Sequence, residues 1–276
     1  MNYRDCYLYG KEKFIQAGIP DAEIDARLLL EAVCGTDRTT LFAHPDREVT
    51  EKEYERYGNY LERRASHIPL QHITGEQEFM GLTFAVNGDV LIPRQETELL
   101  VEEVMLHLHD GMRILDLCTG SGCILCSLLH YSNHCEGVGA DLSEKALAVA
   151  KENAARLQTE QVTFLQSDLF EKVEGSFEII VSNPPYIRSD VIPTLMEEVR
   201  EHEPYMALDG RKDGLYFYRE IISGAPAYLK KGGMLFFEIG FDQGEAVSSL
   251  MRENGFRDVC VKKDYSGFDR IVYGEL

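Results

Sequence analysis

The positions of apolar and polar residues divide the chain into two parts with different periods. In the first part, apolar residues recur at helical spacing over residues 4–17, over residues 21–33 and after Thr50. Thr50 and Glu53 form the sequence pattern of a capping box, which begins a helix. We therefore predict a small helical domain over residues 1–75.

Beyond this domain the period changes to that of strands. Residues 79–92 are rich in strand formers and contain Asn87-Gly88, a dipeptide preferred in tight hairpin turns. We predict a β-hairpin linker over residues 76–92 that contains this turn, followed by an apolar-periodic helix that ends near His107.

Short apolar stretches and amphipathic helices then alternate, as in a doubly wound parallel sheet. The last two strands are joined without room for a crossover helix, so they should pair antiparallel. This pattern predicts a Rossmann-like α/β domain over residues 93–276. The predicted strands are 113–117, 136–141, 161–166, 177–182, 233–239, 256–262 and 269–274, and the predicted helices are 122–131, 143–157, 214–230 and 243–254.

The apolar strand 177–182 ends in Asn183-Pro184-Pro185-Tyr186. Two successive prolines fix φ and lack amide donors, so the chain cannot continue there as a central strand or a helix. The corner therefore presents an Asn side chain, carbonyl groups and an aromatic ring at a carboxyl strand end, where ligands of open α/β sheets bind.

This corner suits methyl transfer to a planar NH₂ group, whose nitrogen is a poor nucleophile because its lone pair is delocalised. The Asn183 side-chain oxygen and the Pro184 carbonyl could accept both N–H groups and turn the lone pair toward an incoming methyl group. The competing interpretation is a simple strand stop, for which one proline would be sufficient.

A glycine turn, Cys118-Thr119-Gly120-Ser121-Gly122, follows the first strand of this domain and opens a helix. Glycines at such a turn let the backbone approach a ligand closely. The turn satisfies neither the dinucleotide fingerprint nor the phosphate-loop pattern, so the sequence offers no dedicated phosphate site here.

Acidic residues follow the next two strands. Asp141 stands about 20 residues beyond the turn, where a ribose-binding carboxylate is expected, and Asp168 could accept a hydrogen bond from an adenine amino group. Asp116, just before the turn, makes a third acidic residue at successive strand ends. Together with a turn that lacks a phosphate site, the three favour S-adenosylmethionine, whose sulfonium tolerates acidic and aromatic surroundings. Each Asp alone could instead cap a helix.

A possible metal pattern is formed by Cys123, Cys126, His130 and His134. If the helix predicted over 122–131 continues to His134, these residues extend over roughly 16 Å, whereas four zinc ligands must converge to about 2 Å from one ion. We therefore expect packing residues and no metal site.

Composition narrows the classes of function. No apolar run approaches membrane-spanning length, and the seven Cys show no disulfide-framework spacing, so we expect a cytoplasmic protein. The formal net charge is −19, of which residues 76–276 carry −16. So acidic a chain disfavours bare nucleic acid as a partner; it would attract a basic protein or simply aid solubility.

These motifs resemble the HemK/PrmC family, the protein-(glutamine amide-N) methyltransferases that act on peptide chain release factors. The most diagnostic pairing is the stretch from Leu91 to Glu98 with a helical amino-terminal domain, since Asn-Pro-Pro-Tyr alone is shared with adenine-amino methyltransferases. The other matching segments are Thr74-Gly75, Glu78-Phe79, Gly81, the glycine turn, Asn183 to Tyr186, Glu203-Pro204, Ala207-Leu208, Asp213-Gly214-Leu215, Tyr218-Arg219 and Glu238-Ile239-Gly240.

The resemblance implies a class I S-adenosylmethionine-dependent methyltransferase that modifies the Gln of a release factor's Gly-Gly-Gln loop and leaves S-adenosylhomocysteine. The helical domain would grip the release factor, and we expect a monomer that contacts neither nucleic acid nor membrane directly. The resemblance assigns substrate binding and catalysis to Asn183, Pro184, Pro185 and Tyr186, and the cofactor to Cys118, Thr119, Gly120, Ser121, Gly122, Asp141, Asp168, Leu169 and Asn183.

Three positions depart from the family pattern: Cys118 replaces a Gly, Gln95 a Pro, and Leu169 an aromatic residue. Cys118 fits the turn if its φ is negative, whereas a positive φ would put cofactor affinity in question. Arg94, together with two nearby glutamates, would either shape the site wall or cap the following helix.

Two other classes of function stay open at this point. One is an enzyme with another substrate, either a ribosomal-protein glutamine or an adenine of nucleic acid. The other is a non-catalytic scaffold with a cofactor fold, against which the complete Asn183 to Tyr186 corner argues.

Overall fold

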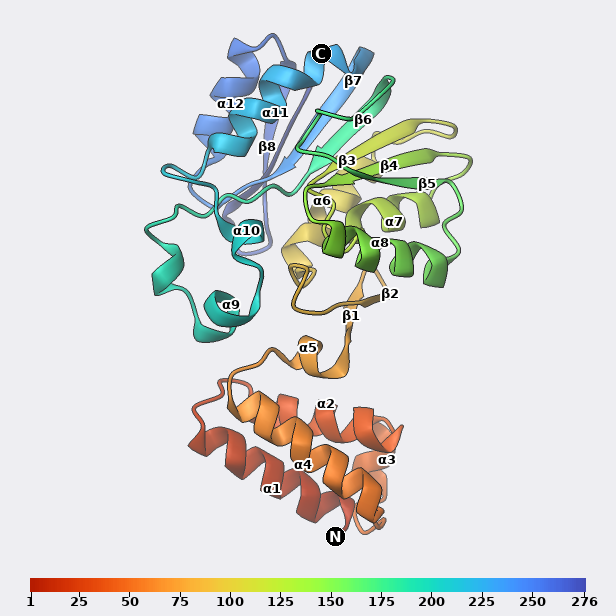
Figure 1. Ribbon diagram of the computed structural model, residues 1–276, viewed down its shortest axis with the longest axis vertical. Helices are drawn as coiled ribbons and strands as arrows, with labels where there is room; N and C mark the ends of the chain where they lie inside the picture. Colours follow the sequence, from red (N-terminus) through yellow and green to blue (C-terminus); the bar gives the residue numbers. More distant parts are fainter. The chain divides into compact units, whose positions relative to one another are not determined.

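The computed structural model describes residues 1–276, which form two compact units. The first comprises Met1–Glu76 together with Met196–His202, and the second comprises Gln77–Leu195 together with Glu203–Leu276. The first unit is helical, and the second is built on a seven-stranded sheet (Figure 1).

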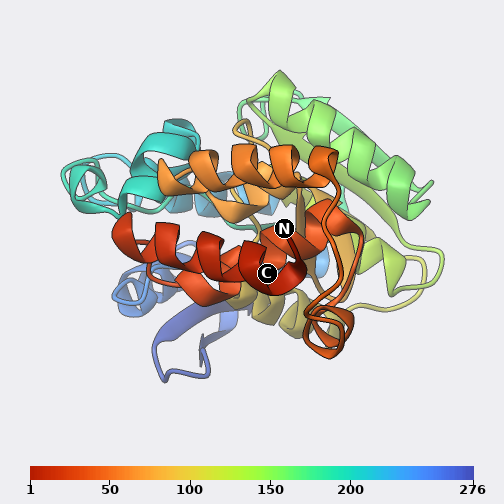
Figure 2. The same cartoon turned by 90° about the horizontal axis from the view of Figure 1, so that it is seen from below.

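The first 75 residues of the helical unit contain five helices: α1 (Tyr3–Gln16), α2 (Ala22–Cys34), α3 (Arg38–Ala43), α4 (Glu51–Ala65) and α5 (Leu70–Thr74). Helices α1, α2 and α4 lie side by side (Figures 1 and 2) because their apolar stripes share one core. The capping box is confirmed: Glu53 N donates to Thr50 Oγ1 at 3.3 Å, and Thr50 N donates to Glu53 Oε2 at 2.8 Å.

A buried ion-pair cluster centred on Arg64 connects α4 with two other segments of this unit. Its Nε lies 2.6 Å from Asp25 Oδ2, and its Nη1 lies 2.8 Å from Glu198 Oε2 of α9 (Glu197–His202). The Arg64 and Asp25 side chains are only 6% and 8% exposed. This cluster explains why residues from far along the chain belong to the helical unit.

The sheet of the second unit has the strand order β5-β4-β3-β6-β7-β9-β8. Its strands are β3 (Arg113–Leu117), β4 (Glu136–Asp141), β5 (Val162–Gln166), β6 (Phe177–Ser182), β7 (Leu229–Glu238), β8 (Arg257–Lys263) and β9 (Asp269–Glu275). Strands β3 to β7 are parallel, and β9 is antiparallel to both β7 and β8, which confirms the predicted topology.

Successive residues of the central strands face opposite sides of the sheet, and each side is covered by helices. Ile114 and Ile179 contribute to the core beneath α6 (Gln95–Met105), α7 (Cys123–His130) and α8 (Glu144–Leu157). Leu115 and Ile180 contribute to the opposite core, beneath α11 (Tyr216–Gly224) and α12 (Gly244–Glu253). Figure 1 shows these two helices on the other side of the sheet from α7 and α8. Burial on both faces is typical of parallel strands and explains their apolar runs.

A hairpin of β1 (Glu76–Phe79) and β2 (Leu82–Ala85) follows the amino-terminal helices, but its predicted turn is wrong. The chain reverses at Met80-Gly81, where both residues have left-handed φ values of 53° and 69°, as a two-residue hairpin turn of this kind requires. Asn87-Gly88 forms a separate turn after β2, because Asn87 Oδ1 accepts a hydrogen bond from Asp89 N at 2.9 Å.

The predicted helix 214–230 is also too long. Helix α11 ends at Gly224, a 3-10 turn over Ala225–Ala227 contains Pro226, and β7 already begins at Leu229 rather than at 233. Proline cannot donate the amide hydrogen bond that would continue the helix. The unpredicted elements are short and so lack a measurable period: α3, α5, α9, α10 (Tyr205–Leu208) and the 3-10 turn η1 (Ile192–Thr194).

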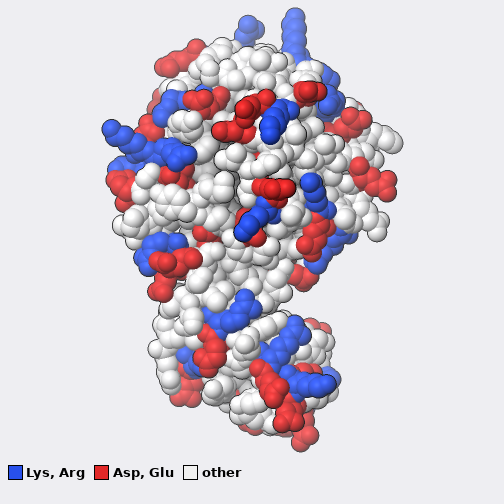
Figure 3. All heavy atoms as spheres, in the orientation of Figure 1, with Lys and Arg blue, Asp and Glu red and all other residues white.

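On the face drawn in Figure 3, acidic and basic side chains are interspersed. None of the helices combines the length and apolar character that crossing a membrane requires.

Replacing Arg64 by Ala should destabilise the protein by about 3–5 kcal/mol, because it leaves the Asp25 carboxylate buried without its partner. The matched control is Arg4→Ala: its pair with Asp46 is 3.7 Å long, and the two side chains are 57% and 80% exposed. The control should change stability by at most about 0.5 kcal/mol. Urea unfolding followed by circular dichroism measures both, and equal small effects would contradict a stabilising role for the cluster.

Candidate active site

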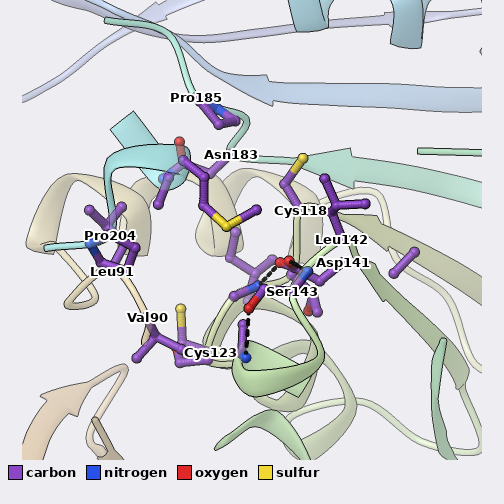
Figure 4. Close-up of a pocket in the computed structure, with 18 of the residues that line it drawn as sticks. Val90, Leu91, Cys118, Cys123, Asp141, Leu142, Ser143, Asn183, Pro185 and Pro204 are labelled. Carbon is purple, nitrogen blue, oxygen red and sulfur yellow. Dashed lines mark hydrogen bonds between the residues drawn. The ribbon is translucent and has the colours of Figure 1, made fainter. Parts of the chain in front are cut away.

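A pocket lies in the second unit at the carboxyl ends of β3, β4, β5 and β6, next to the reversal of strand order between β3 and β6. This is where open α/β sheets bind ligands. The pocket encloses about 990 Å³ including the space open to solvent. Figure 4 shows Asn183 and Pro185 on one side of it and Asp141 with Ser143 on another.

The glycine turn forms the floor of the pocket with left-handed backbone. Gly120 and Gly122 have φ values of 55° and 76°. A side chain on Gly122 would place its Cβ 3.1 Å from Ala150 Cβ, so this glycine allows α7 and α8 to pack closely. Of the five predicted turn residues, Gly122 alone does not line the pocket.

Cys118 has a φ of 60°, the left-handed conformation that Gly adopts without strain. From the sequence we expect a positive φ at Cys118 to put cofactor affinity in question, and the φ is positive. The side chain still lines the pocket. Burial raises the pKa of its thiol, and the charge of Asp141 adds to the effect, so Cys118 is a neutral wall residue rather than a nucleophile.

Asp141 is held at the end of β4 by two backbone hydrogen bonds. Gly120 N donates to its Oδ2 at 2.9 Å, and Ser143 N donates to its Oδ1 at 2.8 Å. Burial raises the pKa of the Asp141 carboxyl group, and these hydrogen bonds oppose the increase. Each carboxylate oxygen can accept a further hydrogen bond, so Asp141 can still bind hydroxyl groups of a ligand.

Asp168 and Leu169 line the pocket beyond the end of β5. The Asp168 side chain is exposed, and Leu169 has a left-handed φ of 45°. Ser167 Oγ donates to the Leu169 carbonyl at 2.9 Å, which stabilises this turn. The structure therefore brings Cys118, Asp141 and Asp168 together around one pocket, whereas Asp116, the third acidic strand end, is fully buried and does not line it.

The corner after β6 contributes Asn183 and Pro185 to the lining, whereas Pro184 and Tyr186 lie outside it. Pro184 is buried, and the Tyr186 carbonyl accepts a hydrogen bond from Gln243 Nε2 at 3.1 Å. The corner is thus held from behind by the loop that follows β7.

The stretch before and within α6 has several separate roles. Arg94 lines the pocket and pairs through Nη2 with Glu203 Oε1 at 2.6 Å. Glu98 Oε1 instead accepts a hydrogen bond from Met80 N at 2.7 Å and holds the hairpin turn. Thr97 also lines the pocket and is 2% exposed.

Most of the remaining pocket wall was missed by reasoning from the sequence. It comes from loops, from the end of β4 and from α7, α8, α10 and α11, which only the fold brings to the strand ends. Some of these residues belong to the segments that match the family, but the sequence assigned them no role in the pocket. These residues are Asp89, Val90, Leu91, Pro93, Cys123, Ile124, Ala140, Leu142, Ser143, Ala146, Ser167, Pro204, Met206, Ala207 and Phe217.

Charged groups on the lining are mostly acidic. Three aspartates, Asp89, Asp141 and Asp168, face a single basic residue, Arg94. Such a set suits a ligand with hydroxyl groups and a positive charge better than one with phosphates. The Cys, His, Asp and Glu side chains of the chain form no group of three that could hold a metal ion. The single helix expected for Cys123 to His134 is wrong, because α7 ends at His130 and His134 has a left-handed φ of 55°.

Comparison with known proteins agrees with this architecture. Residues 5–75 match the PrmC N-terminal domain model, and residues 95–202 match the methyltransferase small domain model. A solved 16S rRNA N2 G1207 methyltransferase of T. Thermophilus, in complex with AdoMet and guanosine, superimposes with a TM-score of 0.52 at 18% identity, covering 72% of this chain and 49% of that one.

The fold is that of the Rossmann-like class I methyltransferases, with helices on both faces of a mostly parallel sheet. The release factor glutamine methyltransferase of Caulobacter vibrioides is 44% identical over 268 residues, 96% of this chain and 93% of that protein. The enzyme of the same name from Clostridium botulinum is 40% identical over 278 residues, 99% and 98% of the two chains. The chain belongs to the family of release factor glutamine methyltransferases.

Gly122→Ala should destabilise the protein by about 1–2 kcal/mol for the left-handed residue, plus about 1–3 kcal/mol for the contact with Ala150. Gly111→Ala is the matched control: its φ is 79°, but an added Cβ meets nothing within 4 Å. The control should show the first penalty only. Identical losses in thermal unfolding would mean that α7 and α8 separate freely to admit the methyl group.

Proposed function

We propose that this protein transfers a methyl group from S-adenosylmethionine to the side-chain amide nitrogen of the Gln in the Gly-Gly-Gln loop of a peptide chain release factor. The carrying observation is that Asn183 lines the same pocket as the glycine turn and Asp141. Membership of the release factor glutamine methyltransferase family supports the choice of substrate. The enzyme would act in the cytoplasm, as a monomer.

The residues present fit S-adenosylmethionine. Asp141 would accept hydrogen bonds from the ribose hydroxyls, Asp168 would accept one from the adenine amino group, and Leu169 would contact the ring. Cys118, Thr119, Gly120 and Ser121 supply the floor, with Gly122 behind them. When bound, S-adenosylmethionine supplies a methyl group made electrophilic by its sulfonium.

The corner after β6 would bind the substrate amide. The Asn183 side-chain oxygen would accept one N–H group from within the pocket. The Pro184 carbonyl would accept the other from the border of the pocket, which Pro184 itself does not line, and the two together would orient the nitrogen toward the methyl group. Pro185 and Tyr186 complete the surface against which the Gln side chain packs. This is catalysis by positioning and fixed dipoles, and it needs no strong base, because the amide proton leaves to water after transfer.

The same proposal divides the work along the chain. Residues 1–75 bind the release factor, residues 76–92 link the two parts, and residues 93–276 carry out the reaction. The Met196–His202 segment, which belongs to the helical unit, would take part in that recognition.

The direct test is methyl transfer from labelled S-adenosylmethionine to a purified release factor, beside a release factor whose Gly-Gly-Gln loop carries Gln→Ala. Label on the unchanged release factor alone is the expected result. Label on neither, when calorimetry shows that the cofactor binds, would reject the release factor as substrate. Equal label on both would move the reaction to another residue.

Two single substitutions should separate catalysis from cofactor binding. Asn183→Ala should lower kcat by about 10²–10³-fold, the loss typical of one fixed dipole in a reaction centre, with little change in cofactor affinity. Asp141→Ala should weaken cofactor binding by about 1–3 kcal/mol, as expected for a lost charge-assisted hydrogen bond. Calorimetry and turnover measure both, and equal loss of affinity in the two variants would contradict these roles.

A further inference from the structure

The Asn183 carboxamide is connected to a chain of hydrogen bonds that runs away from the pocket. Its Nδ2 donates to Thr97 Oγ1 at 3.3 Å, and Thr97 Oγ1 donates to Glu238 Oε2 at 2.6 Å. Thr97 and Glu238 are each 2% exposed. They come from α6 and from the last position of β7, so three distant segments meet behind Asn183.

The number of hydrogen-bond donors among Asn183, Thr97 and Glu238 decides which way the Asn183 carboxamide points. An ionised carboxylate only accepts hydrogen bonds, so the single hydroxyl proton of Thr97 must go to Glu238. The Thr97 oxygen can then only accept, and the group that Asn183 turns toward it must be the NH₂. The Asn183 oxygen is consequently directed away from Thr97 and is free to accept a hydrogen bond.

We infer that Thr97 and Glu238 are positioning residues, which fix the Asn183 carboxamide with its oxygen presented to the substrate amide. This inference rests on the proposed function, in which that oxygen accepts a substrate N–H. Thr97 belongs to the Leu91 to Glu98 stretch, and Glu238 begins the Glu238 to Gly240 stretch. The inference gives both residues a role in orienting Asn183, although neither contacts the reacting atoms.

Protonation of Glu238 would remove the preference for one orientation of the Asn183 carboxamide. A neutral Glu238 can donate its own proton to Thr97, whose hydroxyl is then able to donate to the Asn183 oxygen, so the reversed carboxamide becomes equally well bonded. The reversed carboxamide would present two N–H donors to a substrate group that is itself a donor. Activity should therefore depend on Glu238 being ionised.

The surroundings of Glu238 raise its pKa to near neutral pH, where its protonation can be followed by experiment. Burial raises its pKa to about 7, while hydrogen bonding to Thr97, the charge of Arg270 on β9 and a side-chain interaction with Asn183 oppose the rise. The other titratable groups that face it are Glu96 of α6, Tyr186 of the corner after β6 and Tyr218 of α11. Since the ionised form predominates above the pKa, kcat should rise with pH through about 7 and then level off.

The test compares Thr97→Val, which keeps the shape and removes the hydroxyl, with Thr97→Ser, which keeps the hydroxyl. Thr97→Val should lower kcat by about 10- to 100-fold through misorientation, leave the affinity for S-adenosylmethionine within about threefold, and abolish the rise of kcat near pH 7. Thr97→Ser should retain both the rate and the pH profile. Wild-type kcat in Thr97→Val, or an unchanged pH profile, overturns the inference.

Glu238→Gln is the second variant. Its side-chain amide still offers Thr97 a hydrogen-bond partner, so it can be tested even if Thr97→Val does not fold. A Gln presents either its oxygen or its nitrogen, so it no longer selects one orientation of Asn183. Its kcat should fall and lose the step near pH 7. A Glu238→Gln enzyme with wild-type kcat and an unchanged step overturns the inference.

A measurement that does not involve turnover keeps this inference separate from the proposed function. In protein labelled with ¹⁵N at asparagine, the Asn183 side-chain resonances, assigned by their loss in Asn183→Ala, should titrate near pH 7 in the wild type and in Thr97→Ser only. Resonances that do not titrate in the wild type overturn the inference. A wild type that titrates and yet methylates no release factor supports the orientation by Thr97 and rejects the proposed function.

Discussion

The position of β6 between β3 and β7 is the constraint on which the site depends. All three strands are parallel and buried on both faces. Their backbone N–H and C=O groups therefore have to form hydrogen bonds with the neighbouring strands of the sheet. Ser182 Oγ donates to the Leu117 carbonyl at 2.6 Å, which holds the ends of β6 and β3 side by side. Any ligand held by the glycine turn after Leu117 therefore lies close to whatever follows Ser182.

The two sides of the pocket solve different physical problems. The side with the glycine turn, where we propose that the cofactor binds, is built from backbone: left-handed residues shape the turn, and Gly120 N and Ser143 N orient the Asp141 carboxylate. The side with Asn183, where we propose that the substrate amide binds, needs a carbonyl-type oxygen that points in one direction. Prolines fix the backbone there, whereas the Asn183 side chain depends on the hydrogen-bonded groups behind it.

The loop between Tyr186 and Gly210 connects this chemistry with the helical unit along the chain. It leaves the corner, contributes Met196–His202 to the helical unit, and returns at Glu203, which pairs with Arg94 beside the pocket. The backbone at Gly210 then passes so close to Tyr186 that an added Cβ would lie 2.7 Å from it. Both ends of the loop are thus anchored next to the site.

Periodicity and turn chemistry determined the layout of this protein in advance. The alternation of strands and helices, the antiparallel last pair and the residues at four strand ends are local properties, and the structure brings Cys118, Asp141, Asp168 and Asn183 to one pocket as expected. The tertiary structure alone decided the rest. The φ of Cys118, the separation of Pro184 from the pocket and the chain of bonds from Asn183 to Glu238 all depend on contacts between residues far apart in sequence. No local pattern encodes such contacts, because the free energy that selects them arises only when the segments pack together.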